Sequence, residues 1–217
     1  MVPTLETLSL ADNLINGLIP NSLCKIWTLK ELDLSKNMLF GNLPQCWGDS
    51  GKIPMLQVMK FSSNKLSGII PSSIGHLSTL QWLHLNNNSL YGEIPMGLKN
   101  CTALAVLDLG ENGLSGNISE WIGELDSLRI LRLHKNMFNG KIPLPLCQLL
   151  SLQIIDLANN NLEKTILLCF GNLTGMVLDE SSRLEYTQWL GEPGYGELLE
   201  FCCSRRTRDM LIFDSLI

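Results

Sequence analysis

The chain has 217 residues, of which 45% are apolar and 6% aromatic, and its formal net charge is −5. This length and apolar content are enough to bury a substantial core, which excludes disorder for most of the chain. No basic run or basic stripe stands out, so the charge pattern argues against nucleic acid and anionic membrane as partners.

Seven copies of one pattern follow one another along the chain. They begin at Leu5, Leu29, Leu56, Leu80, Leu104, Leu128 and Leu152, and most copies keep the fixed positions of L-x-x-L-x-L-x-x-N-x-L-x-G-x-I-P. Repeat positions are numbered from these leucines. A period of about 24 residues indicates a solenoid, in which each repeat, or rung, buries its apolar face only against its neighbours.

Within each rung the fixed positions predict the elements in order. The leucines at positions 4 and 6, such as Leu83 and Leu85, alternate as in a short strand, and these strands are expected to stack into one parallel sheet. Asn at position 9, such as Asn88, is expected to bond backbone groups of its own and the next rung as a buried ladder. Gly at position 13 and Pro at position 16 then favour a turn, a second extended segment and a helical or 3₁₀ return. The sequence therefore predicts an α/β solenoid.

The pattern decays near the C-terminus. Lys164 stands at the glycine position of the seventh repeat and Leu167 at the proline position. From Met176 the register is lost, because Asp179 falls where a core leucine is required. We therefore expect residues 5–175 to form seven repeats and residues 176–217 to form a non-repeat tail that is partly disordered.

The segments Leu-Ser-Gly-Ile-Ile-Pro at 66–71, Leu-Tyr-Gly-Glu-Ile-Pro at 90–95 and Phe-Asn-Gly-Lys-Ile-Pro at 138–143 resemble the plant-specific leucine-rich repeat. The lengthened second repeat and the cysteine segments at 23–24, 44–47, 146–147 and 169–174 are similar to those of plant receptor-like protein ectodomains, which look much like receptor kinase ectodomains. The resemblance implies a curved right-handed leucine-rich-repeat superhelix with its parallel β-sheet on the concave face. It also implies that the tail is the start of the non-repeat island found in such ectodomains.

The resemblance carries expectations about function and place. Receptor-like proteins lie at the plasma membrane, bind an extracellular peptide or protein ligand on the outer face, and pair with a co-receptor kinase in defence or developmental signalling. Typical members start with a signal peptide and later carry a transmembrane helix. Neither is recognisable in this chain, whose longest apolar run falls well short of about 18 residues, so we expect no membrane insertion by this segment itself.

Two pairs of cysteines share one spacing. Cys24 and Cys46, like Cys147 and Cys169, are 22 residues apart, which places each pair on adjacent rungs of the convex side. A disulfide is possible there, with a Cα separation near the upper limit of about 6.8 Å, but buried free thiols are an equal alternative. Cys101 is expected to be a small buried hydrophobe, and no metal site is expected.

Four N-x-S/T sequons occur. They lie at Asn87, Asn100, Asn117 and Asn172. Asn100 and Asn172 occupy the same repeat position, 21, three rungs apart, which indicates a shared position on the outer surface. N-glycosylation is expected if the chain enters the secretory route.

The candidate ligand-binding site lies on the concave sheet, where positions 3, 5, 7 and 8 are expected to be exposed. Position 5 gives a charged column, and position 3 gives an apolar lane from the third rung onward. The two meet at Trp82, His84, Asp108, Glu111, Arg132, His134 and Lys135. An aromatic anchor beside mixed charges suits a peptide or protein contact, although alternating charges also suit an ordinary solvated surface.

Catalytic motifs are missing from the sequence: there is no G-x-S-x-G, H-E-x-x-H, P-loop or kinase signature. We therefore expect a binding module that is not an enzyme and needs no cofactor. Two alternatives remain: a soluble secreted inhibitor or scaffold resembling polygalacturonase inhibitors, and a truncated, non-functional receptor remnant. The sequence does not name the ligand.

Overall fold

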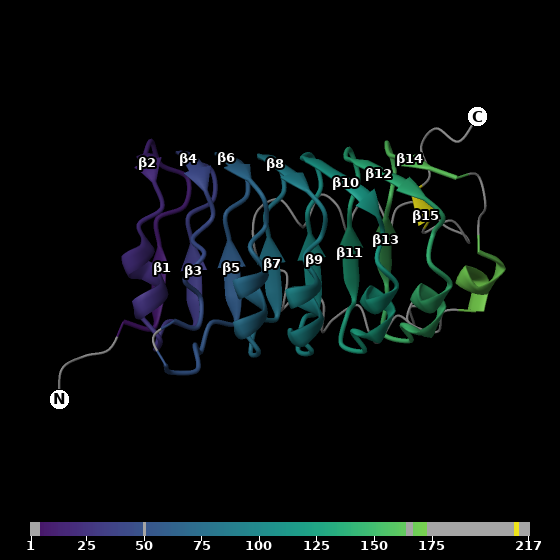
Figure 1. Ribbon diagram of the computed structural model, residues 1–217, viewed down its shortest axis with the longest axis horizontal. Coiled ribbons are helices and arrows are strands. Elements are labelled where there is room, and N and C mark those ends of the chain that lie inside the picture. Colours follow the sequence, from purple (N-terminus) through teal and green to yellow (C-terminus); the bar gives the residue numbers. More distant parts are fainter. Residues whose placement is uncertain (1–4, 50, 164–166, 173–210, 213–217) are drawn as a thin grey trace, which may run out of the picture.

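The computed structural model describes residues 5–49, 51–163, 167–172 and 211–212. The described rungs stack side by side along one axis, each turning through a strand of one sheet and a strand of a second sheet (Figure 1). The predicted solenoid is therefore confirmed. Most of the expected tail, residues 176–210 and 213–217, lies outside the described residues.

The first sheet is parallel and forms the concave face. Its strands, in spatial order, are β1 (Thr7–Ser9), β3 (Glu31–Asp33), β5 (Val58–Lys60), β7 (Trp82–His84), β9 (Val106–Asp108), β11 (Ile130–Arg132), β13 (Ile154–Asp156) and β15 (Leu211–Ile212). Equivalent repeat positions face one another from rung to rung, as Leu83 does Leu107 and His84 does Asp108. The exception is β15, which pairs with β13 although it comes from the expected tail.

The second sheet confirms the predicted second extended segment. Its strands are β2 (Asn16–Leu18), β4 (Met38–Asn42), β6 (Lys65–Gly68), β8 (Ser89–Gly92), β10 (Gly113–Asn117), β12 (Met137–Gly140) and β14 (Asn161–Leu162). Gly92 shows why glycine recurs at position 13: its φ is +82°, and an added Cβ would lie 3.1 Å from Cγ2 of Ile69 on the preceding rung. The backbone conformation and the neighbouring rung therefore both favour glycine.

The return segments are 3₁₀ turns. They are η1 (Asn21–Lys25), η2 (Ser72–His76), η3 (Met96–Asn100), η4 (Glu120–Glu124), η5 (Leu144–Gln148) and η6 (Leu168–Asn172). Each spans five residues, a length that suits i→i+3 hydrogen bonds such as that from the N–H of Leu77 to the carbonyl of Ile74 (3.0 Å). The lengthened second rung turns at Cys46–Asp49 instead, where the N–H of Asp49 donates to the carbonyl of Cys46 (3.1 Å).

The core is a continuous column of leucines and isoleucines between the two sheets. Leu83, Leu85 and Leu90 of the fourth rung are 0% exposed, as are their counterparts Leu107, Leu109 and Leu114 in the fifth. Each such side chain contributes about 1.5–3 kcal/mol of transfer free energy when fully buried. The repeated leucines therefore account for the stacking.

The asparagine ladder is present, but it runs in the opposite direction from the one expected. Asn136 accepts a hydrogen bond from the N–H of Leu114 (2.9 Å) and donates to the carbonyl of Leu109 (3.0 Å), both on the preceding rung. It also donates to the carbonyls of Leu133 and His134 in its own rung. From Asn37 onward, each ladder asparagine thus joins its rung to the one before it.

Candidate ligand-binding site on the concave face

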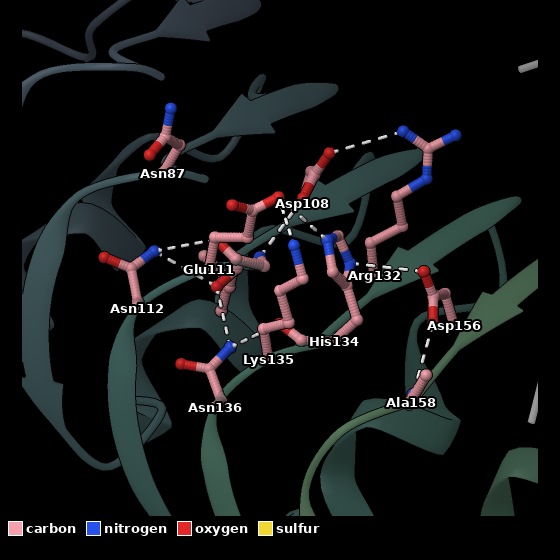
Figure 2. Close-up of polar contacts among 12 residues, drawn as sticks. Asn87, Asp108, Glu111, Asn112, Arg132, His134, Lys135, Asn136, Asp156 and Ala158 are labelled. Atoms are coloured by element: carbon pink, nitrogen blue, oxygen red, sulfur yellow. Dashed lines mark hydrogen bonds and ion pairs between the residues drawn. The ribbon is translucent and has the colours of Figure 1, made fainter. Parts of the chain in front are cut away.

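The seven predicted site residues come from three consecutive rungs. Trp82 and His84 are on β7, Asp108 ends β9 and Arg132 ends β11. The parallel register places His84 next to Asp108, and Asp108 next to Arg132. Glu111, His134 and Lys135 follow in the turns after β9 and β11, where they lie close to the Asp108–Arg132 pair (Figure 2). The structure therefore brings the predicted residues together on one face.

Position 5 is not exposed in these rungs, contrary to the sequence prediction. The exposed fractions are 6% for Lys60, 4% for His84, 3% for Asp108 and 7% for Arg132. Strands in a sheet are about 4.8 Å apart, so each of these side chains is flanked by its counterparts on the rungs before and after it. The position-3 lane is covered too at its centre, where Val106 and Ile130 are each 6% exposed.

These buried charges lie in opposite-charge pairs. Nη1 of Arg132 lies 3.4 Å from Oδ2 of Asp108, and Nζ of Lys60 lies 3.9 Å from Oδ2 of Asp33. Burial raises the pKa of Asp108, while the Arg132 guanidinium and the Gly110 N–H oppose that rise. Such pairing is what allows charged groups to be retained in a site of low dielectric.

His84 lies between the two pairs as a neutral ring. Burial, and then the positive charges of Lys60 and Arg132, lower the pKa of His84 to about 3. The ring also meets Trp82 edge-on, with 6.3 Å between centroids, and Nζ of Lys60 lies 5.8 Å from the Trp82 ring centroid. Trp82 is half-buried, so part of its side chain is packed and part is accessible to a partner.

The rim of the site carries the accessible charges. The side chains of Glu111 and Lys135 are 44% and 56% exposed, and Nζ of Lys135 lies 3.4 Å from Oε1 of Glu111. Both residues are at repeat position 8, which is left-handed in all seven rungs, with φ of +55° for Glu111 and +50° for Lys135. This conformation turns the chain from the first sheet to the second and holds the side chain at the rim.

Two participating residues were not among the predicted site residues. Lys60 contacts Trp82 as described, and Oδ2 of Asp156 lies 3.2 Å from Nδ1 of His134. Both occupy repeat position 5, so the charged column predicted from the sequence already included them. The sequence did not show that His134, at position 7, would reach across to the next rung.

Three of the four sequon asparagines are exposed. Asn87 lies in the turn after β7, Asn100 ends η3 and Asn117 ends β10, so they project from different parts of the solenoid. Asn172 ends η6 at the position that Asn100 has in η3, and its side chain lies outside the described residues. Glycosylation at these four positions stays a prediction.

The structure joins both cysteine pairs by disulfides. The Cα atoms of Cys24 and Cys46 are 5.7 Å apart, and those of Cys147 and Cys169 are 5.8 Å apart. These separations are near the commonest value for disulfides, and below the limit that the two-residue offset suggested, because the turns of adjacent rungs lie close together. Cys101 is a buried free thiol whose pKa is raised to about 11 by burial.

Among the residues that the structure describes, no group of three or more His, Cys, Asp and Glu side chains is arranged to hold a metal ion. Nor does that part of the chain contain a helix with the length and apolar character needed to cross a membrane.

The comparisons with known proteins agree with this architecture. The Leucine Rich Repeat family matches residues 4–26, 28–50, 55–77, 79–101, 103–125, 127–149 and 151–173. Receptor-like protein 53 of Arabidopsis thaliana is 38% identical over 106 residues, which are 49% of this chain and 11% of that protein. Receptor-like protein 18 of the same plant is 35% identical over 128 residues, 49% of this chain and 15% of that protein.

Solved structures show the same similarity. The plant peptide hormone receptor RGFR1, in complex with RGF2, is 38% identical with a TM-score of 0.70, over 72% of this chain and 25% of that one. The Arabidopsis receptor kinase HAESA, in complex with the peptide hormone IDA and the co-receptor SERK1, is 37% identical with a TM-score of 0.70, over 76% of this chain and 27% of that one. The chain thus spans only a small part of each of these proteins. It belongs to the leucine-rich repeat family, and its rungs resemble those of plant receptor ectodomains.

Proposed function

We propose that this chain is the ligand-binding segment of a plant cell-surface receptor, on the extracellular face of the plasma membrane. Its concave face would bind an extracellular peptide or protein in defence or developmental signalling, and a co-receptor kinase would complete the signalling complex. The observation that carries the proposal is the gathering of Trp82, the Asp108–Arg132 pair and the charged rim on one face of the solenoid. The similarity to receptors solved with peptide hormones supports the ligand class.

The physical basis is preorganisation. Trp82, Asp108 and Arg132 belong to strands that pair in register with both neighbours, so their backbones are fixed before a ligand arrives. A fixed aromatic side chain loses little conformational freedom on binding, which favours it as an anchor. Glu111 and Lys135 stand at the accessible rim, where charges steer the approach and set the register of a partner.

Disulfides and sequons fit an extracellular location. Disulfides persist in oxidising compartments and are rare in the cytosol, so the pairs Cys24–Cys46 and Cys147–Cys169 support secretion of the parent protein. We propose that the asparagines of the four sequons carry N-linked glycans there. A glycan on Asn100 would project from η3 and leave the strands of the concave sheet open.

The test is a selection of random phage-displayed peptides on the disulfide-bonded chain, followed by affinity measurements on variants. Trp82→Ala combined with Arg132→Ala should lower the affinity for the selected peptides at least about tenfold, because both side chains belong to the centre of the site. The exposed pair Glu111→Ala and Lys135→Ala provides a second site variant that leaves the buried ion pair intact. Met96→Ala with Lys99→Ala on η3 is the matched control.

Binding within twofold of the parent by both site variants, with circular dichroism unchanged, would place the ligand elsewhere. A selection that yields no binder at all would favour the non-functional remnant.

A further inference from the structure

Asn87 differs from the other exposed sequon asparagines in its place on the solenoid. It occupies repeat position 8 of rung four, the same left-handed position as Glu111 in rung five and Lys135 in rung six, and it lies at the same edge of the concave face (Figure 2). Asn100 ends a return turn, and Asn117 ends a strand of the second sheet. Of these three exposed asparagines, Asn87 is the one at the rim of the candidate site.

Backbone hydrogen bonds tie Asn87 to the rim of the next rung. The N–H of Asn87 donates to the carbonyl of Gly110 (2.9 Å), and the N–H of Asn88 donates to the carbonyl of Glu111 (3.1 Å). Neighbouring strands are about 4.8 Å apart, so a group attached to Asn87 begins about one such step from Glu111. These bonds therefore fix the attachment point relative to a residue of the site.

The side chain of Asn87 can accept a sugar without the loss of a buried contact. Its Nδ2 donates to Oγ of Ser63 on the preceding rung (3.2 Å), and this hydrogen bond is exposed. An N-linked sugar replaces one of the two hydrogens on Nδ2 and leaves the other as a donor. The neighbouring Asn88, by contrast, donates to the carbonyls of the ladder. The modified residue and the ladder residue of this sequon are therefore separate.

From this placement we infer that an N-glycan on Asn87 forms one wall of the candidate binding site. An N-linked glycan is bulky and hydrophilic. Attached at the rim of rung four, it closes the approach to Trp82 and the Asp108–Arg132 pair across that rim. A ligand then reaches these residues from the opposite edge, where the concave strands begin. The inference rests on the proposed function, because N-glycans are added in the secretory route.

The opposite edge of the concave sheet is open to such a ligand. The residues directly before β5, β7, β9 and β11 are exposed or partly exposed: Gln57, Gln81, Ala105 and Arg129. None of the four sequons falls at this repeat position, so no N-glycan is attached there. The two glutamine side chains offer both hydrogen-bond donors and acceptors to a peptide backbone. The glycan therefore closes one edge of the site and leaves the other edge free.

The test uses the whole chain secreted from plant cells, with and without the sequon at Asn87. Ser89→Ala removes this sequon but keeps the Asn87 side chain, and Ser89 is exposed on β8, so we expect the fold to be unchanged. The first measurement needs no ligand: mass spectrometry follows the rate at which a carbodiimide couples an amine to the Glu111 carboxylate. This rate should rise at least about threefold in Ser89→Ala, because no bulky glycan covers the rim.

Two controls separate the wall from general effects of glycosylation. The exposed Glu163 on the seventh rung should react at the same rate in the parent and in Ser89→Ala. Asn117→Gln removes the sequon on the second sheet, and it should leave the Glu111 rate at the parent value. A parent chain without a glycan on Asn87, or a glycosylated parent whose Glu111 reacts as fast as in Ser89→Ala, would overturn the inference.

The second measurement is peptide affinity. Phage-displayed peptides selected on the Ser89→Ala chain should include binders whose affinity for the glycosylated parent is at least about tenfold lower, because the glycan bars their approach. Equal affinities of all these peptides for the two chains would also overturn the inference. A selection without binders would count against the proposed function alone, since the Glu111 rate decides separately whether the glycan covers the rim.

Discussion

Replacing the ladder residue Asn136 by alanine should strongly destabilise the solenoid. Asn136 is 8% exposed and makes four hydrogen bonds, one accepted and three donated. The three carbonyls that it bonds have other partners; those of Leu109 and Leu133 also accept from Asn112 and Asn160. The N–H of Leu114, by contrast, has the Asn136 side chain as its acceptor and is buried.

The expected loss of stability follows from these hydrogen bonds. An orphaned buried N–H costs about 1–3 kcal/mol, and each shared hydrogen bond to a carbonyl adds at the low end of about 0.5–1.5 kcal/mol. Asn136→Ala should therefore lower the free energy of unfolding by about 3 kcal/mol. The measurement is urea unfolding followed by circular dichroism, with the disulfides intact.

Asn13→Ala is the matched control, because Asn13 has the same repeat position at the exposed first rung. Its amide donates to the carbonyls of Leu10 and Ala11 of its own rung. We expect this variant to lose less than about 1 kcal/mol, since no buried group is orphaned. Equal losses for Asn13→Ala and Asn136→Ala would refute the ladder as the link between rungs.

Two further predictions concern the packing of the return turns and the response to acid. Gly75→Ala should cost about 1–3 kcal/mol of unfolding free energy, because the new Cβ would collide with the backbone carbonyl of Gly97 on the next turn; the exposed Ser78→Ala should change little in the same urea titration. His84 has a pKa of about 3 in the folded chain, below the value of about 6.5 in the unfolded chain, so between these values only the unfolded chain takes up the proton. Stability should therefore fall as the pH drops below about 6.5, by up to about 1.4 kcal/mol per pH unit, and His84→Leu should remove that contribution. The check is the unfolding free energy of the parent chain and of His84→Leu at about pH 7 and pH 5. If both lose the same amount between these two pH values, His84 is not the group responsible.

The fold could be predicted from the sequence because each rung repeats the same pattern of residues. Leucines at positions 4 and 6 and glycine at position 13 place the two strands, as Leu83, Leu85 and Gly92 show in the fourth rung. The direction of the ladder could not be predicted in this way. It depends on how successive rungs lie against one another, which the sequence of one rung does not specify.

The sequence correctly predicted that the site residues are neighbours, but it did not predict that several of them are buried. Position alone suggested that His84, Asp108 and Arg132 face solvent, whereas their burial depends on side chains from adjacent strands. Likewise, the left-handed backbone at Glu111 and Lys135 has no sequence signal, because neither residue favours that conformation. The connection between the two sheets imposes it on whatever residue occupies position 8.

The central claim is that the concave strands contact the ligand. Hydrogen–deuterium exchange of the whole chain, with and without a peptide from the selection, tests this most directly. The account predicts that added protection is concentrated in β7, β9, β11 and the turns that follow them, and that η2, η3 and η4 are unchanged. Protection concentrated in the 3₁₀ turns or in the second sheet, with the concave strands unchanged, would contradict it.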